Sequence, residues 1–300
     1  MTAHILRGAG LSSRLKTEIV RASALLADRG GRPPRLATLL IGDDPSSRAY
    51  RLSIERTMLN VGIAHVAVDL IAETTADAVA HVLADLSLDP EVTGVLVLMP
   101  LPERLHPRVI YDVLSPFKDV DGITPTNAGR LHMGLPSLRP STPQGGIELL
   151  DHYGIETEGR RAVVIGRSNV VGRPLGSLLL QRHATVTLCH RQTVDLGSIS
   201  RTADILAIAA GHAGLICGDM VKPGAKVIDF GVNVVDGKVV GDADFGSVAD
   251  VAGAVTPVPG GTGPVTALVL ARNTVAAGLA ALGGTLDHVD FLRRATSDRV

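Results

Sequence analysis

The feature that most constrains this chain is a glycine-bracketed loop between two apolar segments in its second half. Residues 163–174 read V-V-I-G-R-S-N-V-V-G-R-P, with Gly166 and Gly172 at the two ends of the polar part. β-Branched residues precede the loop and helix-forming residues follow it, which predicts a strand, a glycine turn and a helix. In a parallel α/β sheet, such a turn directs backbone N–H groups and the positive end of a helix dipole towards an anion.

This loop by itself leaves two interpretations open. Its spacing is glycine, five residues, glycine, which differs from the G-x-G-x-x-G of the commonest dinucleotide-binding turn. A nucleotide site and an ordinary tight turn are equally compatible with the stretch. The remainder of the chain has to distinguish them.

Length, charge and cysteine content limit the classes of function. A chain of 300 residues with 45% hydrophobic residues can bury a large core, and more often forms two domains than one. The formal net charge of −1 gives no electrostatic reason to expect nucleic acid or a membrane surface as a partner. Cys189 and Cys217 fit no zinc or disulfide pattern, which suits a reducing cytoplasm. No signal peptide is visible, and residues 265–282 are expected to form a buried helix and not a membrane span.

The first half of the chain alternates between strand and helix patterns, which predicts a parallel sheet with helical crossovers. The expected helices are residues 11–29, 45–61 and 75–88, and the expected strands are residues 36–41, 65–70 and 94–99. Asp44 and Pro45 are expected to be the N-cap and the first-turn proline of the second helix. Residues 115–143 are rich in proline and glycine and are expected to be a functional surface loop that ends in an interdomain crossing.

The second half repeats the α/β pattern. A helix is expected to start near residue 145. The expected strands are residues 162–165, 184–189, 205–209 and 226–230, with a helix at residues 170–182 after the first of them. A loop rich in proline and glycine at residues 255–264 precedes the last long helix, and residues 295–300 are expected to fray. The fold class is therefore α/β, with two α/β lobes.

Five separated motifs occur together in one order. They are G-D-D-P-S-S-R-A-Y at 42–50, P-L-P at 100–102, K-D-V-D-G at 118–122, the glycine loop at 163–174, and T-P-V-P-G-G-T-G-P at 256–264. Each motif alone is weak, but in this combination the chain resembles the methylenetetrahydrofolate dehydrogenase/methenyltetrahydrofolate cyclohydrolase family, from about residue 37 to residue 281.

The resemblance implies two α/β lobes around a cleft, the second of them a Rossmann-like NAD(P)-binding domain. It implies that residues 1–142 with 272–300 form the folate-binding and catalytic lobe, and that residues 143–271 form the dinucleotide-binding lobe. It further implies a cytoplasmic enzyme of one-carbon metabolism, a tetrahydrofolate derivative as substrate, and a homodimer joined through the cofactor lobes. No metal is expected.

For the cofactor, the resemblance assigns Gly166, Arg167 and Ser168 to the phosphate-binding loop. Arg191 follows the strand where the adenosine ribose should lie, and an arginine suits the 2′-phosphate of NADP through charge-assisted contacts, so NADP is favoured over NAD. Val232 matches a position that lines the nicotinamide. Taken singly, either arginine would be interpreted as a solvated surface charge and Val232 as a core residue.

For the folate, the resemblance assigns Asp121 to the carboxylate that binds the pterin, and a carboxylate can accept two hydrogen bonds from the amino-pyrimidinone edge. Tyr50 matches a tyrosine that stacks near the substrate, and Pro259, Gly260 and Gly261 match a loop whose backbone approaches the pterin. Without the resemblance, Asp121 would be interpreted as part of a D-G turn, Tyr50 as a helix-packing residue, and residues 259–261 as a tight turn.

Two positions depart from the family pattern and change the expected mechanism. Where the family carries a catalytic lysine, four residues after Tyr50, this chain has Ile54, and where it carries the partner glutamine, before P-L-P, it has Leu98. Losing both polar groups together is physically coherent, because one left alone would be a buried unpaired group costing about 1–3 kcal/mol. No catalytic residue is certain. The expected function is NADP-dependent oxidation of 5,10-methylenetetrahydrofolate to 5,10-methenyltetrahydrofolate, with cyclohydrolase activity lost or very weak.

Two other interpretations stay open from the sequence. One is a bifunctional dehydrogenase/cyclohydrolase with a relocated base, for which Tyr50, Arg51 and His106 are conceivable substitutes, although an arginine stays protonated and is a poor proton shuttle. The other is a non-catalytic relative that binds folate or dinucleotide. An intact cofactor loop and Asp121 argue against loss of binding, whereas Ile54 and Leu98 argue against the complete family mechanism.

Overall fold

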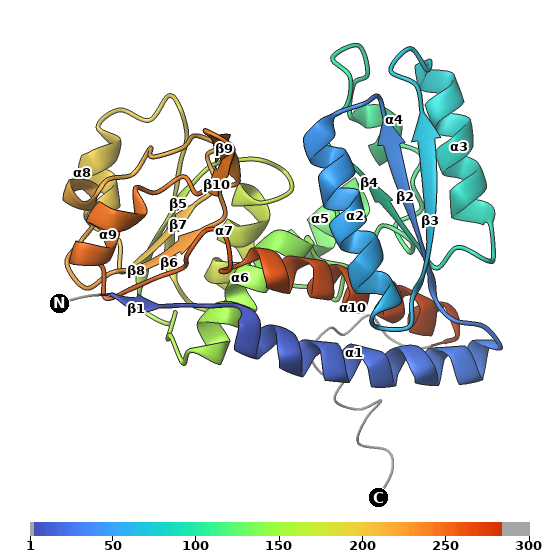
Figure 1. The fold of residues 1–300 in the computed structure, drawn as a ribbon, viewed down its shortest axis with the longest axis horizontal. Helices are drawn as coiled ribbons and strands as arrows, with labels where there is room; N and C mark the ends of the chain where they lie inside the picture. Colours follow the sequence, from blue (N-terminus) through green and yellow to red (C-terminus); the bar gives the residue numbers. More distant parts are fainter. Residues whose placement is uncertain (1–2, 284–300) are drawn as a thin grey trace, which may run out of the picture. The chain divides into compact units, whose positions relative to one another are not determined.

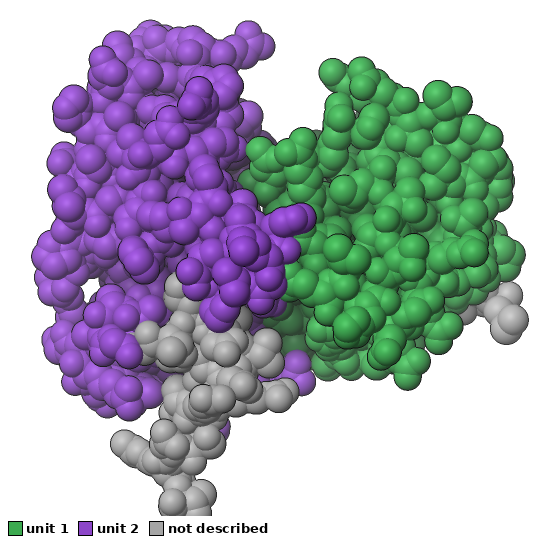
Figure 2. Space-filling model, turned by 180° about the vertical axis from the view of Figure 1, so that it is seen from behind, with its two compact units in different colours: residues 1–13, 142–266 green, residues 14–141, 267–300 purple. Residues whose placement is uncertain are grey.

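The computed structural model describes residues 3–283, and the tail expected at 295–300 lies outside this range (Figure 1). The chain divides into two compact units (Figure 2). One unit comprises residues up to 13 and residues 142–266, and the other comprises residues 14–141 and residues from 267 onwards. Each unit contains its own parallel sheet.

The unit with residues 14–141 is built on a three-stranded parallel sheet of order β3-β2-β4. The strands are β2 (Arg35–Ile41), β3 (Ala64–Leu70) and β4 (Gly94–Val97). The helices before and between them are α1 (Ala9–Gly30), α2 (Pro45–Leu59) and α3 (Ala76–Leu88), followed by α4 (Arg108–Tyr111) and α5 (Pro125–His132). The central strand β2 is buried from its second residue onwards, as the near-continuous apolar run predicts for a strand with neighbours on both sides.

Local sequence signals explain where α2 and α5 begin. Asp44 is the N-cap of α2 and accepts a hydrogen bond from the N–H of Ser47 at 2.8 Å, which confirms the prediction for Asp44 and Pro45. The segment expected as surface loop at 115–143 contains α5, because Thr124 caps the N–H of Asn127 and Pro125 occupies the first turn. Eight residues of polar composition gave too little apolar periodicity to predict this helix.

The other unit is built on a six-stranded parallel sheet of order β1-β11-β8-β7-β5-β6. Its strands are β1 (His4–Ile5), β5 (Arg161–Ile165), β6 (Thr185–Cys189), β7 (Ile205–Ile208), β8 (Lys226–Asp229) and β11 (Ala254–Val255). The helices are α6 (Ser141–His152), α7 (Gly172–Gln181), α8 (Leu196–Ser200) and α9 (Phe245–Val251), and β9 (Asn233–Val235) and β10 (Lys238–Val240) form a separate hairpin. Its core contains Val163, Leu206 and Val227 from three neighbouring strands.

The N-terminal residues join this second sheet, whereas the sequence placed them with the first lobe. His4 and Ile5 pair with Ala254 and Val255 in parallel register, and the N–H of Leu6 donates to the carbonyl oxygen of Val255 at 2.9 Å. A strand of two residues has no periodicity of its own. Its position is set by backbone hydrogen bonds to a segment about 250 residues away, which the local sequence does not encode.

The last helix, α10 (Gly263–Ala281), is mostly apolar, with Arg272 and Asn273 as buried polar residues. It is long and apolar enough to cross a bilayer, yet 83% of its most apolar 18-residue window is buried within the protein. A mostly apolar helix that is covered by protein is the expected pattern for a core helix. This agrees with the buried helix predicted for residues 265–282.

Candidate functional site

The loops at one edge of the six-stranded sheet gather the residues predicted to bind the cofactor. All strands of this sheet run parallel, so the loops after β5, β6, β7, β8 and β11 leave from the same edge. β5 pairs with β6 on one side and with β7 on the other, so the direction of strand addition reverses there. Ligands of open α/β sheets bind at such a reversal, outside the carboxyl ends of the strands.

Close backbone approach explains the two glycines of the turn from β5 to α7. Gly166 has a φ of +129°, and a Cβ there would lie 2.2 Å from the carbonyl oxygen of Ala209. A Cβ on Gly172 would lie 2.1 Å from the carbonyl oxygen of Gly166. Between them, Ser168 Oγ accepts hydrogen bonds from the N–H groups of Val171 and Gly172 at 3.1 and 3.4 Å. The unusual glycine spacing therefore matches a tight turn at the start of α7.

The other predicted cofactor residues lie at the same edge. Arg167 and Ser168 follow Gly166, Arg191 lies two residues after β6, and Val232 lies three residues after β8. Both arginines are exposed, and within residues 3–283 neither side chain has a hydrogen-bond or ion-pair partner. Val232 is 73% exposed, so it is not the core residue that its type alone would suggest. The edge thus presents two unpaired guanidinium groups beside a helix N-terminus.

A buried aspartate that the sequence pattern did not single out holds the loop after β7. Asp242 has no exposed surface, and its Oδ2 accepts hydrogen bonds from the N–H groups of Ala210 and Gly211 at 2.6 and 2.9 Å. Its Oδ1 accepts hydrogen bonds from the N–H of His212 and from the side-chain amide of Asn233, both at 2.9 Å. The carboxylate therefore fixes this loop and ties it to the β9–β10 hairpin.

Asp229, the last residue of β8, extends the same network. Its carboxylate accepts the N–H groups of Gly231, Asp242 and Ala243 at 2.8, 3.1 and 2.9 Å. The pKa of Asp229 is raised to about 6, chiefly by burial; the three N–H groups act in the opposite direction, and the charge of Asp242 adds to the rise. The available sequence signal was an aspartate ending an apolar strand, followed by G-D-A-D at 241–244.

The loop after β11 carries the residues predicted to approach the pterin. Gly260 has a φ of +103°, which favours glycine, and its carbonyl oxygen accepts the N–H of Gly8 at 2.9 Å. A Cβ on Gly261 would lie 2.6 Å from the carbonyl oxygen of Pro257. Pro259 is exposed and Gly261 is buried. These three residues therefore belong to the same unit, and the same sheet edge, as the predicted cofactor loop.

Asp121 lies in the other unit, and its carboxylate is only partly engaged. Its Oδ1 accepts hydrogen bonds from the N–H and the hydroxyl of Ser141 at 3.1 and 2.8 Å, and within residues 3–283 no hydrogen bond reaches Oδ2. Burial raises the pKa of Asp121 to about 6; the Ser141 hydrogen bonds act in the opposite direction, and the charge of Asp119 adds to the rise. The neighbouring Gly122 has a φ of +60°, and a Cβ there would lie 2.5 Å from the carbonyl oxygen of Leu138.

Tyr50 lies near Asp121, whereas Ile54 and Leu98 are buried. Tyr50 is 39% exposed on α2, but surrounding protein atoms desolvate its hydroxyl and raise its pKa, and the charge of Asp121 adds to the rise. Ile54, four residues further on α2, is 0% exposed, and Leu98, directly after β4, is 2% exposed. The two aliphatic side chains that stand where the resemblance expects lysine and glutamine are therefore core residues.

Two of the three conceivable substitutes for a base, Arg51 and His106, make contacts elsewhere. Arg51 forms an ion pair with Asp69, and its side chain is only 12% exposed. His106 is exposed, and its Nδ1 accepts a hydrogen bond from the N–H of Arg108 at 3.1 Å. Neither geometry is that of a positioned acid or base.

Comparison with known families settles the relationship of the chain. The family described as tetrahydrofolate dehydrogenase/cyclohydrolase, catalytic domain, matches residues 6–121, and its NAD(P)-binding domain matches residues 140–281. The chain belongs to the tetrahydrofolate dehydrogenase/cyclohydrolase family. Its fold is accordingly the α/β arrangement of that family, with a Rossmann-like NAD(P)-binding domain and a separate catalytic domain.

Individual members of the tetrahydrofolate dehydrogenase/cyclohydrolase family match over nearly their whole length. The bifunctional protein FolD of Chloroflexus aurantiacus is 51% identical over 284 residues, covering 94% of this chain and 100% of that protein. The bifunctional FolD of Campylobacter jejuni superimposes with a TM-score of 0.89 at 39% identity, covering 93% of this chain and 99% of that chain. The enzyme of Trypanosoma brucei, solved with NADP cofactor and an inhibitor, gives 0.90 at 32% identity, covering 95% and 100%.

Proposed function

We propose that this protein oxidises 5,10-methylenetetrahydrofolate to 5,10-methenyltetrahydrofolate with NADP, and that its cyclohydrolase activity is lost or very weak. One observation carries the proposal. Ile54 and Leu98 are fully buried aliphatic side chains at the two positions that the family pattern gives to a proton-transfer pair, while the cofactor edge keeps its glycine turn and unpaired arginines.

NADP is the cofactor that this edge supports best. The Gly166 turn leads into the N-terminus of α7, whose dipole favours an anion, and Arg167 and Arg191, which have no side-chain partner within residues 3–283, can contact phosphate. Guanidinium groups bind phosphate bidentately, so an arginine after β6 favours the 2′-phosphate of NADP over the free hydroxyl of NAD. The relative from Trypanosoma brucei was solved with NADP. In this assignment Val232 lines the nicotinamide.

Asp121 supplies the proposed pterin contact. Among the described residues no hydrogen bond reaches its Oδ2, and Ser141 orients Oδ1, so the carboxylate is held in place and can still accept hydrogen bonds from an amino-pyrimidinone. Because its pKa is about 6, the carboxylate is lost as the pH falls through 6, and the KM for the folate should rise by roughly tenfold per pH unit below that value. Asp121→Asn should remove this pH dependence and raise the KM at pH 7.5.

The oxidation needs alignment more than acid–base chemistry. The nitrogen lone pair of the folate drives hydride release, so no proton has to be removed from the reacting carbon. When bound, the nicotinamide accepts the hydride. The chain contributes the Gly166 turn for the cofactor, and Tyr50 and the backbone of Pro259, Gly260 and Gly261 for the substrate.

Hydrolysis of the methenyl ring has a different requirement. Water attack and ring opening need a group that gives and takes protons, and a lysine of lowered pKa beside a glutamine can do so. Ile54 and Leu98 have no titratable atom. Arg51 is paired with Asp69, and an arginine stays protonated.

A two-signal assay on the purified protein tests the proposal. Methylenetetrahydrofolate is supplied with NADP or NAD, and reduced cofactor and the methenyl chromophore are followed together. We expect both signals to rise in parallel with NADP, and added methenyltetrahydrofolate to decay no faster than in buffer. Faster decay would favour the bifunctional alternative with a relocated base. Binding of NADP without turnover would favour the non-catalytic alternative.

We also propose a cytoplasmic homodimer joined through the cofactor units. Among the described residues β6 pairs only with β5, so one edge of the sheet lacks a partner strand, and Leu188 on it is 44% exposed. Leu180, on the preceding helix, is 62% exposed. Light scattering after size exclusion should give twice the chain mass of 31.2 kDa, and Leu188→Arg should reduce it to one chain. A single-chain mass for the unchanged protein would contradict this proposal.

A further inference from the structure

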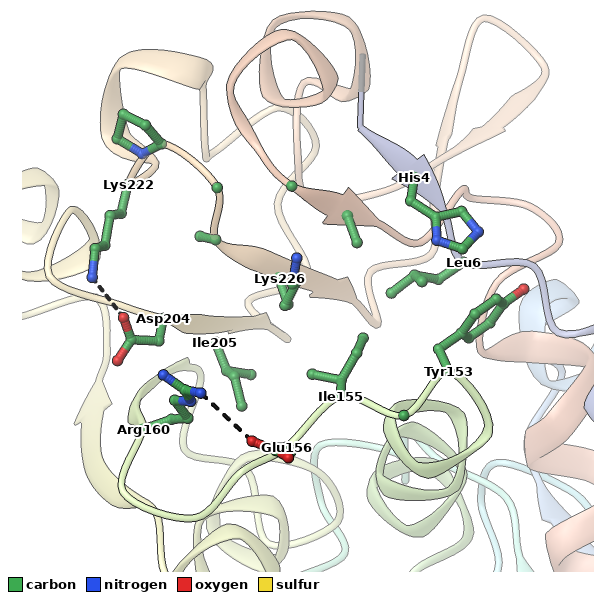
Figure 3. Close-up of a pocket in the computed structure, with 16 residues that line it drawn as sticks. His4, Leu6, Tyr153, Ile155, Glu156, Arg160, Asp204, Ile205, Lys222 and Lys226 are labelled. Atoms are coloured by element: carbon green, nitrogen blue, oxygen red, sulfur yellow. Dashed lines mark hydrogen bonds and ion pairs between the residues drawn. The ribbon is translucent and has the colours of Figure 1, made fainter. Parts of the chain in front are cut away.

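A cavity lies at the edge of the six-stranded sheet opposite to the predicted cofactor loops. Its volume is about 550 Å³, and it is lined where β1, β7, β8 and β11 begin and where the chain passes from α6 to β5 (Figure 3). Ligand pockets commonly have roughly 300–1,000 Å³. The predicted cofactor residues follow the carboxyl ends of the strands, so this cavity is separate from them.

The charged side chains around the cavity leave one cation unpaired. Lys222 Nζ lies 2.6 Å from Asp204 Oδ1, and the guanidinium of Arg160 lies 3.6 Å from a carboxylate oxygen of Glu156 (Figure 3). The other oxygen of Asp204 accepts a backbone N–H at 2.9 Å, so both oxygens of this carboxylate already have a partner. Within residues 3–283, Lys226 has no hydrogen-bond or ion-pair partner for its side chain. Because partial burial of a charge without a partner is unfavourable, an anion that enters the cavity would gain a charge-assisted contact with Lys226.

The sheet holds Lys226 in a defined position. It is the first residue of β8 and pairs with Ile205 of β7 on one side and with Ala254 of β11 on the other. Its Nζ lies so close to Gly253 that a Cβ there would be 2.8 Å away. In Figure 3, Lys226 lies between the Lys222 pair and Tyr153. The backbone of Lys226 is therefore carried by a rigid element, and its ammonium group lies beside Gly253.

One wall of the cavity is aromatic and fixed. The hydroxyl of Tyr153 donates a hydrogen bond to the carbonyl oxygen of Arg7 at 2.9 Å. Its ring makes edge-to-face contacts with His4 and His152, with centroid distances of 5.3 and 5.0 Å. Ile155 adds an apolar surface next to it (Figure 3). A flat apolar group can pack here without first ordering the wall.

We infer that this cavity binds a small organic carboxylate with a flat, apolar body, its carboxylate on Lys226 and its body against Tyr153 and Ile155. A monoanion fits because the other two cations already have carboxylate partners, which leaves one positive charge to neutralise. The inference is independent of the proposed reaction, because no residue of this cavity belongs to the dehydrogenase site.

Paired probes that differ only in charge test the inference. 2-Naphthoate and 2-naphthamide are titrated into ¹⁵N-labelled full-length protein saturated with NADP, and amide shifts are followed by NMR. We expect naphthoate to shift the amides of Lys226, Gly253 and Tyr153 saturably, and to bind about tenfold more tightly than naphthamide, because a charge-assisted contact is worth that ratio. Lys226→Met should abolish the preference. Lys238→Met, which removes an exposed lysine of the β9–β10 hairpin, should retain it.

Three results would overturn the inference. Equal affinity of the two probes for the unchanged protein would show that no cation selects the ligand, and this comparison does not depend on whether any variant folds. A preference that survives Lys226→Met, or that is lost equally in Lys238→Met, would place the charge elsewhere. Saturable shifts confined to the carboxyl-edge loops would place the ligand at the cofactor site.

Discussion

Replacing Asp242 by asparagine tests whether the buried carboxylate network sets the shape of the cofactor edge. The carboxylate accepts four hydrogen bonds, three from backbone N–H groups and one from the Asn233 amide. Asparagine keeps one acceptor oxygen but replaces the other by an amide NH2 group. This NH2 group is a donor, and it would face the two N–H donors that the lost oxygen accepted. Two charge-assisted hydrogen bonds, worth about 1.5–3 kcal/mol each, are then lost. Removing the charge beside Asp229 offsets a part of this loss, so we expect a net loss of roughly 3 kcal/mol, at the lower end of that sum.

Thermal unfolding and NADP binding measure the two consequences of Asp242→Asn. A loss of this size should lower the unfolding midpoint by roughly 6–12 °C. Because residues 210–212 lose their anchor, the Kd for NADP should rise by about tenfold. Asp250→Asn is the matched control, since it removes the same charge from an exposed position on α9. The reasoning is wrong if Asp242→Asn unfolds within about 1 °C of the unchanged protein, or if both variants weaken NADP binding equally.

Three further predictions concern the glycine turn, the first sheet and the missing lysine. Gly166→Ala should destabilise the protein by about 2 kcal/mol or more and abolish NADP binding, because its Cβ would lie 2.2 Å from a carbonyl oxygen, whereas Gly129→Ala, with open space around it, should do neither. Burial lowers the pKa of His65 below 6.5, so the unfolded chain binds more protons and the free energy of unfolding should fall as the pH drops below 6.5. The difference between the unchanged protein and His65→Gln in urea unfolding at pH 5, 6 and 7 isolates this contribution; a pH-independent difference would contradict it. Ile54→Lys alone should cost roughly 3–5 kcal/mol as an unpaired buried charge, while adding Leu98→Gln should restore part of that stability and raise methenyl hydrolysis above the buffer rate. Hydrolysis that stays at the buffer rate in a folded double variant would show that more than this pair is missing.

The sequence predicted the regular elements wherever a run of residues carried its own periodicity. Expected strands at 36–41 and 65–70 correspond to β2 and β3, and the N-cap at Asp44 was correct because a side-chain acceptor and a following proline determine it locally. The loops after the strands could also be located, because the carboxyl ends of parallel strands share one edge.

What the sequence could not show depends on contacts between distant residues. Asp242 binds the N–H groups of residues 210–212, about 30 positions earlier, and nothing in G-D-A-D marks its side chain as buried. β1 and β11 are two residues long, and each exists only through backbone pairing with a neighbour. Short segments of this kind have too few residues to show a period, so their structure follows from the completed sheet.

The predicted cofactor edge contains two carboxylates, and their burial explains why it can still bind an anion. Arg167 and Arg191 are exposed and have no side-chain partner among residues 3–283, whereas Asp229 and Asp242 are buried and turned towards loop N–H groups. Burial makes ionised Asp229 costly: its folded pKa of about 6 exceeds the ordinary 3.8, so the folded protein binds more protons in this window and loses stability as the pH rises through it. At neutral pH that cost is present in full. The same carboxylate accepts the hydrogen bonds that shape the loops. The edge that we propose to receive a phosphate is therefore held in shape by carboxylates whose oxygens face inward, which leaves Arg167 and Arg191 as its exposed positive charges.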